Sequence, residues 1–155
     1  MKTGIALGSN LGDRAASMDA GFTFLRSLSQ KGYLLQSSVI ETDPVDCPPG
    51  SGAFFNAVAE IDYEGSPLQL LGQLQNFEHT MGRQPNRAIN APRPLDLDIL
   101  YFGDTTITTP DLIIPHPRIA QREFVLKPLA EICPNLILPG QAHSVQTLLN
   151  HLTSK

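Results

Sequence analysis

Residues 54–62 read Phe54-Phe55-Asn56-Ala57-Val58-Ala59-Glu60-Ile61-Asp62, in which every second residue from Phe55 to Ile61 is apolar. Successive side chains of a strand point to opposite faces of its sheet. The stretch therefore predicts a strand whose one face carries Phe55, Ala57, Ala59 and Ile61, and whose other face carries Phe54, Asn56 and Val58.

A helix is predicted directly after this strand. Ser66-Pro67-Leu68-Gln69 has the form of a capping box with proline at the first helical position. Apolar residues then recur at helical spacing up to a glycine at position 82, namely Leu70, Leu74, Phe77 and Met81. Residues 83–94 carry three prolines and no period, which indicates a loop, and residues 95–102 read as the next strand.

The first part of the chain repeats this alternation of strand and helix. Residues 2–7 predict a strand that runs into a turn at residues 8–12, Gly-Ser-Asn-Leu-Gly. A helical period follows from Met18 to Leu28, and residues 33–40 read as a second strand. Residues 43–52 are rich in proline and glycine, which favours a long loop.

Two helices are expected near the C-terminal end. One covers residues 119–127 and ends near Pro128, and Ser144 caps the other. The order β-α-β-β-α-β with helices appended predicts an α+β, ferredoxin-like fold: an antiparallel sheet with helices on one face and additional C-terminal helices. No repeat or linker interrupts the chain, so we expect a single domain over residues 1–155.

Composition restricts the class of protein. The chain has 155 residues, 41% hydrophobic and 17% charged, and no apolar run long enough to cross a membrane. A net charge of −4 argues against binding to nucleic acid. The start of the chain does not resemble a secretory signal, and no exposed apolar helix face is evident, so we expect a cytoplasmic monomer. Neither Cys47 nor Cys133 has metal-ligand spacing around it.

Positive charge is concentrated in one part of this acidic chain. Five of its seven arginines fall between positions 83 and 122: Arg83, Arg87, Arg93, Arg118 and Arg122. Guanidinium groups bind phosphate through paired hydrogen bonds. Because neither a P-loop motif nor G-x-G-x-x-G occurs in the chain, these arginines are the better candidates for a polyanion site.

The sharpest local motif is Pro92-Arg93-Pro94-Leu95-Asp96-Leu97-Asp98-Ile99-Leu100. On a strand, Asp96 and Asp98 share one face. Leu95, Leu97 and Ile99 point the other way, into the core. Two neighbouring carboxylates repel each other unless a cation lies between them, and Mg²⁺ binds carboxylates together with phosphate oxygens. The motif predicts a metal–nucleotide site, although a solvated sheet face carrying two aspartates remains an alternative.

Two further clusters are candidates for binding. Pro115-His116-Pro117-Arg118 and the later Arg122 suit a phosphate tail, with both arginines on one face if a helix has begun there. A buried turn histidine and two surface arginines are the alternative. Phe54, Asn56 and Phe124 could enclose a flat heterocycle and read its polar edge, although core packing would also explain both phenylalanines.

In their order along the chain, these motifs resemble the 6-hydroxymethyl-7,8-dihydropterin pyrophosphokinase family over nearly the whole length. The resemblance also includes Glu41-Thr42-Asp43-Pro44, Glu78 before Gly82-Arg83, and Arg122-Glu123-Phe124-Val125-Leu126. It implies a ferredoxin-like enzyme that transfers diphosphate from Mg-ATP to the hydroxymethyl group of a reduced pterin in folate synthesis.

The resemblance also implies a role for individual residues. Asp96 and Asp98 would hold two Mg²⁺ ions, and Arg83 and Arg93 would act on the phosphates during transfer. The remaining ATP contacts would come from Gln75, Glu78, His116, Arg118 and Arg122. The pterin would lie between Phe54 and Phe124, with Asn56, Thr42, Pro44 and Val45 as its further contacts.

Two other functions are compatible with the same motifs. A metal-dependent phosphohydrolase would use the two aspartates with water as nucleophile, and it would release phosphate without any pterin. A ferredoxin-like sensing module would bind a nucleotide or metabolite without turnover.

Overall fold

The computed structural model describes residues 1–42, 53–82 and 94–154. Its main sheet has β1 (Lys2–Ser9) in the centre, between β4 (Phe54–Asp62) and β5 (Asp96–Phe102). At the far edge of β4 lie two short strands, β2 (Leu34–Gln36) and β3 (Ile40–Thr42). All pairs in this sheet are antiparallel, which confirms the ferredoxin-like prediction.

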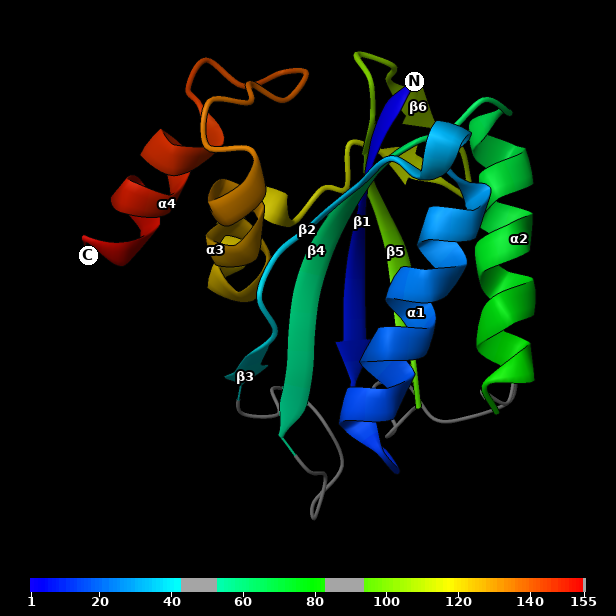
Figure 1. Ribbon diagram of the computed structural model, residues 1–155. Helices are drawn as coiled ribbons and strands as arrows, with labels where there is room; N and C mark the ends of the chain where they lie inside the picture. Colours follow the sequence, from blue (N-terminus) through cyan, green and yellow to red (C-terminus); the bar gives the residue numbers. More distant parts are fainter. Residues whose placement is uncertain (43–52, 83–93, 155) are drawn as a thin grey trace.

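Helices cover both faces of the sheet (Figure 1). α1 (Arg14–Leu28) and α2 (Pro67–Thr80) lie on one face and enclose the larger core with Ile5, Leu7 and the buried apolar residues of β4 and β5. α3 (Glu123–Ile132) packs on β4 from the other face, and α4 (Val145–Thr153) packs on α3. The expectation of helices on one face therefore holds for α1 and α2, while the C-terminal helices build a second core.

Local sequence signals place the helix starts. Ser66 and Gln69 form the expected capping box at α2. The Ser144 side chain accepts a hydrogen bond from the Thr147 amide at the start of α4. At α1, the cap is Asp13, whose side chain accepts from the Ala16 amide, so this helix begins earlier than its apolar period indicated. Among the described residues, no helix combines the length and apolar character needed to cross a bilayer.

The predicted strand over residues 33–40 is wrong in detail, because the structure has β2 and β3 in its place. The pairing changes register between Gln36, opposite Ala59, and Ile40, opposite Asn56. Between them, Ser37 satisfies both polar groups of Val58: its amide donates to the Val58 carbonyl, and its hydroxyl accepts from the Val58 amide. A side chain thus replaces one backbone partner, and the strand is interrupted there.

The predicted helix over residues 119–127 is confirmed in part, but its bounds are wrong. A short 3-10 turn, η2 (Ile119–Gln121), is followed by α3, which continues through Pro128 instead of ending there. Proline lacks the amide that would bond to the carbonyl four residues earlier, so it disfavours a helix interior. Burial of Val125, Leu126 and Leu129 against the sheet outweighs this cost.

A small hairpin follows β5, and the sequence did not predict it. It consists of β6 (Ile107–Thr108) and β7 (Ile113–Ile114). Thr109 closes its turn, because its hydroxyl accepts from the Leu112 amide at 3.1 Å and donates to the Leu112 carbonyl at 3.0 Å. β7 contacts β5, so the hairpin stands beside the free edge of the main sheet.

A bulge divides β5 into two halves. The register with β1 shifts between Gly4 and Ile5, and both Leu100 and Tyr101 consequently lie in the second core, on the α3 side. The Tyr101 ring lies so close over Gly4 that a Cβ there would collide with it. Before the bulge, the same side of β5 carries Asp96 and Asp98 instead.

A buried carboxylate links the second core to the sheet. Glu60 is 7% exposed and accepts hydrogen bonds from the Tyr33 hydroxyl at 2.9 Å and from the Tyr101 hydroxyl. The Cys133 thiol donates to the same carboxylate at 3.4 Å. Three donors from three parts of the chain therefore stabilise one buried charge.

Candidate active site

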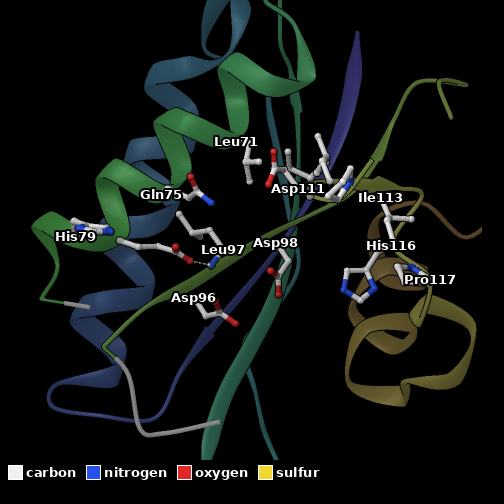
Figure 2. Close-up of a pocket in the computed structure, with 14 residues that line it drawn as sticks. Leu71, Gln75, His79, Asp96, Leu97, Asp98, Asp111, Ile113, His116 and Pro117 are labelled. Carbon is white, nitrogen blue, oxygen red and sulfur yellow. Dashed lines mark hydrogen bonds between the residues drawn. The ribbon is translucent and has the colours of Figure 1, made fainter. Parts of the chain in front are cut away.

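A cleft of about 670 Å³ opens between α2, β5 and the hairpin (Figure 2). Its lining includes five residues that the sequence placed in a nucleotide or metal site: Gln75, Glu78, Asp96, Asp98 and His116. Gln75 extends from α2, both aspartates from β5, and His116 from the segment after the hairpin. Elements that are far apart in the sequence thus bring these side chains to one opening.

Asp96 and Asp98 lie on the same side of β5, as predicted. Both are half-buried and line the cleft. Leu97 and Ile99, between and beyond them, also border the cleft but are buried in the larger core. The part of the chain that the structure describes has no group of three or more histidine, cysteine or acidic residues able to hold a metal. Two hard carboxylates with room beside them fit Mg²⁺ whose remaining ligands come from phosphate and water.

Glu78 fixes the strand between these two aspartates. Its side chain is 6% exposed, and its Oε2 accepts a hydrogen bond from the Leu97 amide at 2.7 Å. Figure 2 shows this bond reaching from α2 to β5. Since Leu97 separates Asp96 from Asp98, the bond holds the backbone that orients both carboxylates.

His116 faces the aspartates from the other wall of the cleft (Figure 2). Its amide donates to the Leu100 carbonyl at 2.9 Å, which ties this turn to the bulge in β5. Its Nδ1 accepts from the Arg118 amide at 3.2 Å, so a neutral ring carries its proton on Nε2. Burial lowers the pKa of His116, and repulsion from Arg122 and Arg118 lowers it further, against the opposing attraction of Asp96.

Arg118 and Arg122 do not share one helix face, and that expectation is wrong. Arg118 caps η2, while Arg122 stands between η2 and α3 in extended conformation. Neither residue lines the cleft itself. Both nevertheless lie close enough to lower the pKa of His116, so their positive charge acts on the wall of the cleft that His116 forms.

A row of residues connects the cleft to β4. Asp96 pairs with Gly8 on β1, and Gly8 pairs with Asn56 on β4. Asn56 is 8% exposed, and its Nδ2 donates to the Thr42 hydroxyl at 2.6 Å. Gly8, in the middle of this row, is buried and adds no side chain between Asp96 and Asn56.

The two phenylalanines predicted to sandwich a ring come from different elements on this side of the sheet. Phe54 begins β4, opposite Thr42, and Phe124 lies in the first turn of α3. α3 packs on β4, and the Arg122 guanidinium lies 5.5 Å from the centre of the Phe124 ring. Both rings are half-buried, so part of each surface remains open to solvent.

Four predicted site residues lie outside the described residues: Pro44, Val45, Arg83 and Arg93. Conversely, the sequence did not indicate that Leu71, His79 and Asp111 line the cleft. Leu71 and His79 follow from the helical period of α2, which places them with Gln75 and Glu78. Asp111 belongs to the hairpin turn, for which the sequence carried no periodic signal.

Two carboxylates and a histidine of lowered pKa line one cleft beside the sheet, and this arrangement is compatible with an enzyme that acts on phosphate groups. A comparison with protein families is more specific, since residues 4–134 match 7,8-dihydro-6-hydroxymethylpterin-pyrophosphokinase (HPPK). The chain belongs to this family. It is an ATP-dependent diphosphokinase of folate biosynthesis that transfers diphosphate to hydroxymethyldihydropterin.

Relatives in bacteria and a fungus are similar over most of the chain. It is 42% identical to the 2-amino-4-hydroxy-6-hydroxymethyldihydropteridine pyrophosphokinase of Bacillus subtilis over 130 residues, 83% of this chain and 76% of the relative. The corresponding enzyme of Haemophilus influenzae is 41% identical over 88% of this chain and 84% of its own length. The folic acid synthesis protein fol1 of Pneumocystis carinii is 42% identical over 91% of this chain, which corresponds to 19% of that longer protein.

Solved structures show the same fold at low sequence identity. A crystal structure of Plasmodium falciparum HPPK-DHPS with pteroate superposes with a TM-score of 0.73 and 16% identity, covering 99% of this chain and 42% of that one. A variant of the same protein with STZ-DHP gives a TM-score of 0.78 and 15% identity, covering 99% of this chain and 45% of that one. The chain thus spans less than half of these proteins. Family membership sets aside the hydrolase and sensor hypotheses.

Proposed function

We propose that Asp96 and Asp98 hold two Mg²⁺ ions together with the phosphates of ATP. The support is their position: two carboxylates on one side of β5, lining one cleft, with the intervening backbone fixed by Glu78. Bound magnesium would neutralise charge on the phosphate oxygens and bring the two substrates into line. Glu78 would contribute by keeping both carboxylates directed at the same point.

ATP would occupy the cleft with its phosphates near the aspartates and its nucleoside toward Gln75. Neutral His116 would donate a hydrogen bond from Nε2 to a phosphate oxygen, and Arg118 and Arg122 would attract the polyanion at the entrance. Arg83 and Arg93, for which the family resemblance implies a role on the phosphates, would complete the neutralisation. The support for this division is that Gln75 on α2 and His116 after the hairpin lie on opposite walls of the cleft, with the two aspartates between them (Figure 2).

The reduced pterin would lie above Gly8, between Phe54 and Phe124. Asn56 would read its polar edge, since one amide hydrogen is bound to Thr42 while the rest of the amide can face a ligand. Thr42, Pro44 and Val45 would supply the remaining contacts. The row Asp96–Gly8–Asn56 supports this proposal, because a pterin held by Asn56 and phosphates held by Asp96 would then be neighbours on one sheet.

In this arrangement, the pterin hydroxyl would attack the β-phosphorus of ATP, and the bond from that phosphorus to the oxygen that bridges it to the α-phosphorus would break. AMP would leave with the bridging oxygen, and the hydroxyl proton would pass to solvent. The chain contributes chiefly by positioning both substrates and by neutralising charge. No side chain is required as a dedicated base. We also propose that residues 1–155 act as one domain, and that the enzyme works as a cytoplasmic monomer.

The test is AMP formation from Mg-ATP with and without 6-hydroxymethyl-7,8-dihydropterin. Asp96→Asn and Asp98→Asn should each lower the rate at least about 100-fold, because loss of a metal-binding charge removes several kcal/mol of stabilisation. Asp104→Asn is the matched control, since Asp104 is exposed and follows the same strand. AMP release that is indifferent to pterin, or folded variants with unchanged rates, would reject the assignment.

A further inference from the structure

Arg14, the first residue of α1, contacts both strands that carry the proposed pterin residues. Its Nη1 donates a hydrogen bond to the Ala53 carbonyl at 2.7 Å and lies 3.3 Å from Glu41 Oε2. Its guanidinium carbon also lies 4.1 Å from the centre of the Phe55 ring. One side chain therefore joins α1 to β3 and to the start of β4.

These contacts lie on the α1 side of the sheet, whereas the pterin residues face the opposite side. Glu41 pairs directly with Phe55, and in the next pair Thr42 lies opposite Phe54. Neighbouring residues of a strand point to opposite faces. Arg14 thus holds the same two backbone segments from behind and does not reach the ligand space itself.

β3 needs such support because it is short and lies at the edge of the sheet. It has three residues, and among the described strands it pairs with β4 only. An ion pair to Glu41, whose side chain is 59% exposed, contributes little on its own. The short hydrogen bond from a charged donor to Ala53 and the contact with the Phe55 ring are stronger constraints.

We infer that Arg14 is a positioning residue for the pterin half of the active site. By fixing β3 and the start of β4 relative to α1, it sets the separation of Thr42, Phe54 and Asn56, and therefore the fit of the flat ring. This inference rests on the pterin site proposed above. It concerns affinity for one substrate only, because Arg14 does not line the cleft assigned to ATP.

The experiment compares Arg14→Met, Arg14→Lys and Arg26→Met. Methionine keeps the apolar stem but removes the charge and the donors, while lysine keeps the charge without the guanidinium's fork of donors. Arg26 is the matched control, since it is exposed in the last turn of the same helix. The readouts are KM for 6-hydroxymethyl-7,8-dihydropterin, KM for ATP, kcat and the melting temperature.

Arg14→Met should raise KM for the pterin about 10-fold, as expected for the loss of one charged hydrogen bond. KM for ATP should stay within about twofold, and Tm within about 4 °C of the Arg26→Met value. Arg14→Lys should recover part of the affinity. Equal KM values for Arg14→Met and Arg26→Met would overturn the inference, and so would a general loss in which Tm and both KM values worsen together.

Amide hydrogen exchange without substrates separates this inference from the proposed function. If Arg14 positions β3, exchange at residues 40–42 should become faster in Arg14→Met than in Arg26→Met, with the rest of the sheet unchanged. Faster exchange in an enzyme that shows no pterin-dependent turnover would reject the proposed function, while the support that Arg14 gives to β3 would stand. Unchanged exchange would reject the role of Arg14 whatever the turnover.

Discussion

Asp96 and Asn56 lie opposite the same residue, Gly8, from its two sides: Asp96 on β5 and Asn56 on β4. Two strand spacings separate their backbones, about 10 Å. Gly8 itself is buried, and the side chains nearest to a Cβ at this position belong to Asn56 and Phe54. The width suits a flat heterocycle beside a phosphate chain, with the acidic end of the row toward the cleft.

Gly8 therefore offers a test of the pterin position. A Cβ at residue 8 would lie 3.4 Å from Asn56 Oδ1 and 3.8 Å from Phe54 Cδ1, which are ordinary contacts. Gly8→Ala should thus fold normally, with a free energy of unfolding equal to the wild type or about 0.5 kcal/mol higher. Gly8→Val extends into the ligand space and should raise KM for the pterin at least about 10-fold.

Steady-state kinetics with both substrates and urea unfolding check this prediction. The graded pair of variants is its own control, because only the larger side chain should affect the pterin strongly. A Gly8→Val enzyme with wild-type KM for the pterin would place the ring elsewhere.

The Glu78 carboxylate should contribute to stability as well as to the orientation of the aspartates. Glu78→Ala leaves the buried Leu97 amide without its acceptor, so the free energy of unfolding should fall by about 2 kcal/mol. Glu78→Gln keeps an acceptor oxygen and should lose less. Urea unfolding measures both, with Glu64→Ala, at an exposed position, as the control. Equal stability of all three variants would contradict a structural role for this bond.

His116 should make stability depend on pH in a definite direction. Its pKa in the folded protein is lowered by burial and by Arg122 and Arg118, so the unfolded chain takes up a proton first as the pH falls below about 6.5. Stability therefore decreases on acidification through this range. The loss between pH 7 and pH 5.5 in urea unfolding should be smaller for His116→Gln than for the wild type. An imidazole that titrates above 6.5 by NMR would contradict this sign.

The thiol of Cys133 should react slowly with alkylating reagents. Burial, followed by the negative charge of Glu60, raises the pKa of Cys133 to about 11 from an ordinary value of 9.0. At pH 8 its alkylation in a Cys47→Ser background should be about 100-fold slower than that of an exposed thiol, because the thiolate reacts. Glu60→Gln removes the charge and should accelerate labelling by iodoacetamide. Fast labelling of the folded Cys47→Ser protein would contradict the buried cluster.

The sequence predicted those elements whose signals are local. β4 shows alternation, and α2 has a capping box, a proline at its first position and a closing glycine. The face shared by Asp96 and Asp98 follows from the period of a strand once the buried residues beside them are recognised. These features need no knowledge of distant parts of the chain.

Features that depend on tertiary contacts could not be found this way. Pro128 signals a helix end, yet packing of α3 on β4 carries the helix through it. The interruption of the second strand depends on a hydroxyl of Ser37 that bonds to Val58, which is distant in sequence. The contacts of Arg14 could not be predicted either, because only the folded sheet brings Glu41 and Ala53 next to it.

The bulge at Leu100 and Tyr101 has a consequence for how the enzyme could change over evolution. On one side of β5, residues before the bulge line the cleft, and residues after it lie in the second core. Mutations that alter substrate preference can accumulate in the first half without disturbing the residues that keep α3 in place. A single irregularity in one strand thus uncouples the adaptation of this active site from the maintenance of its fold.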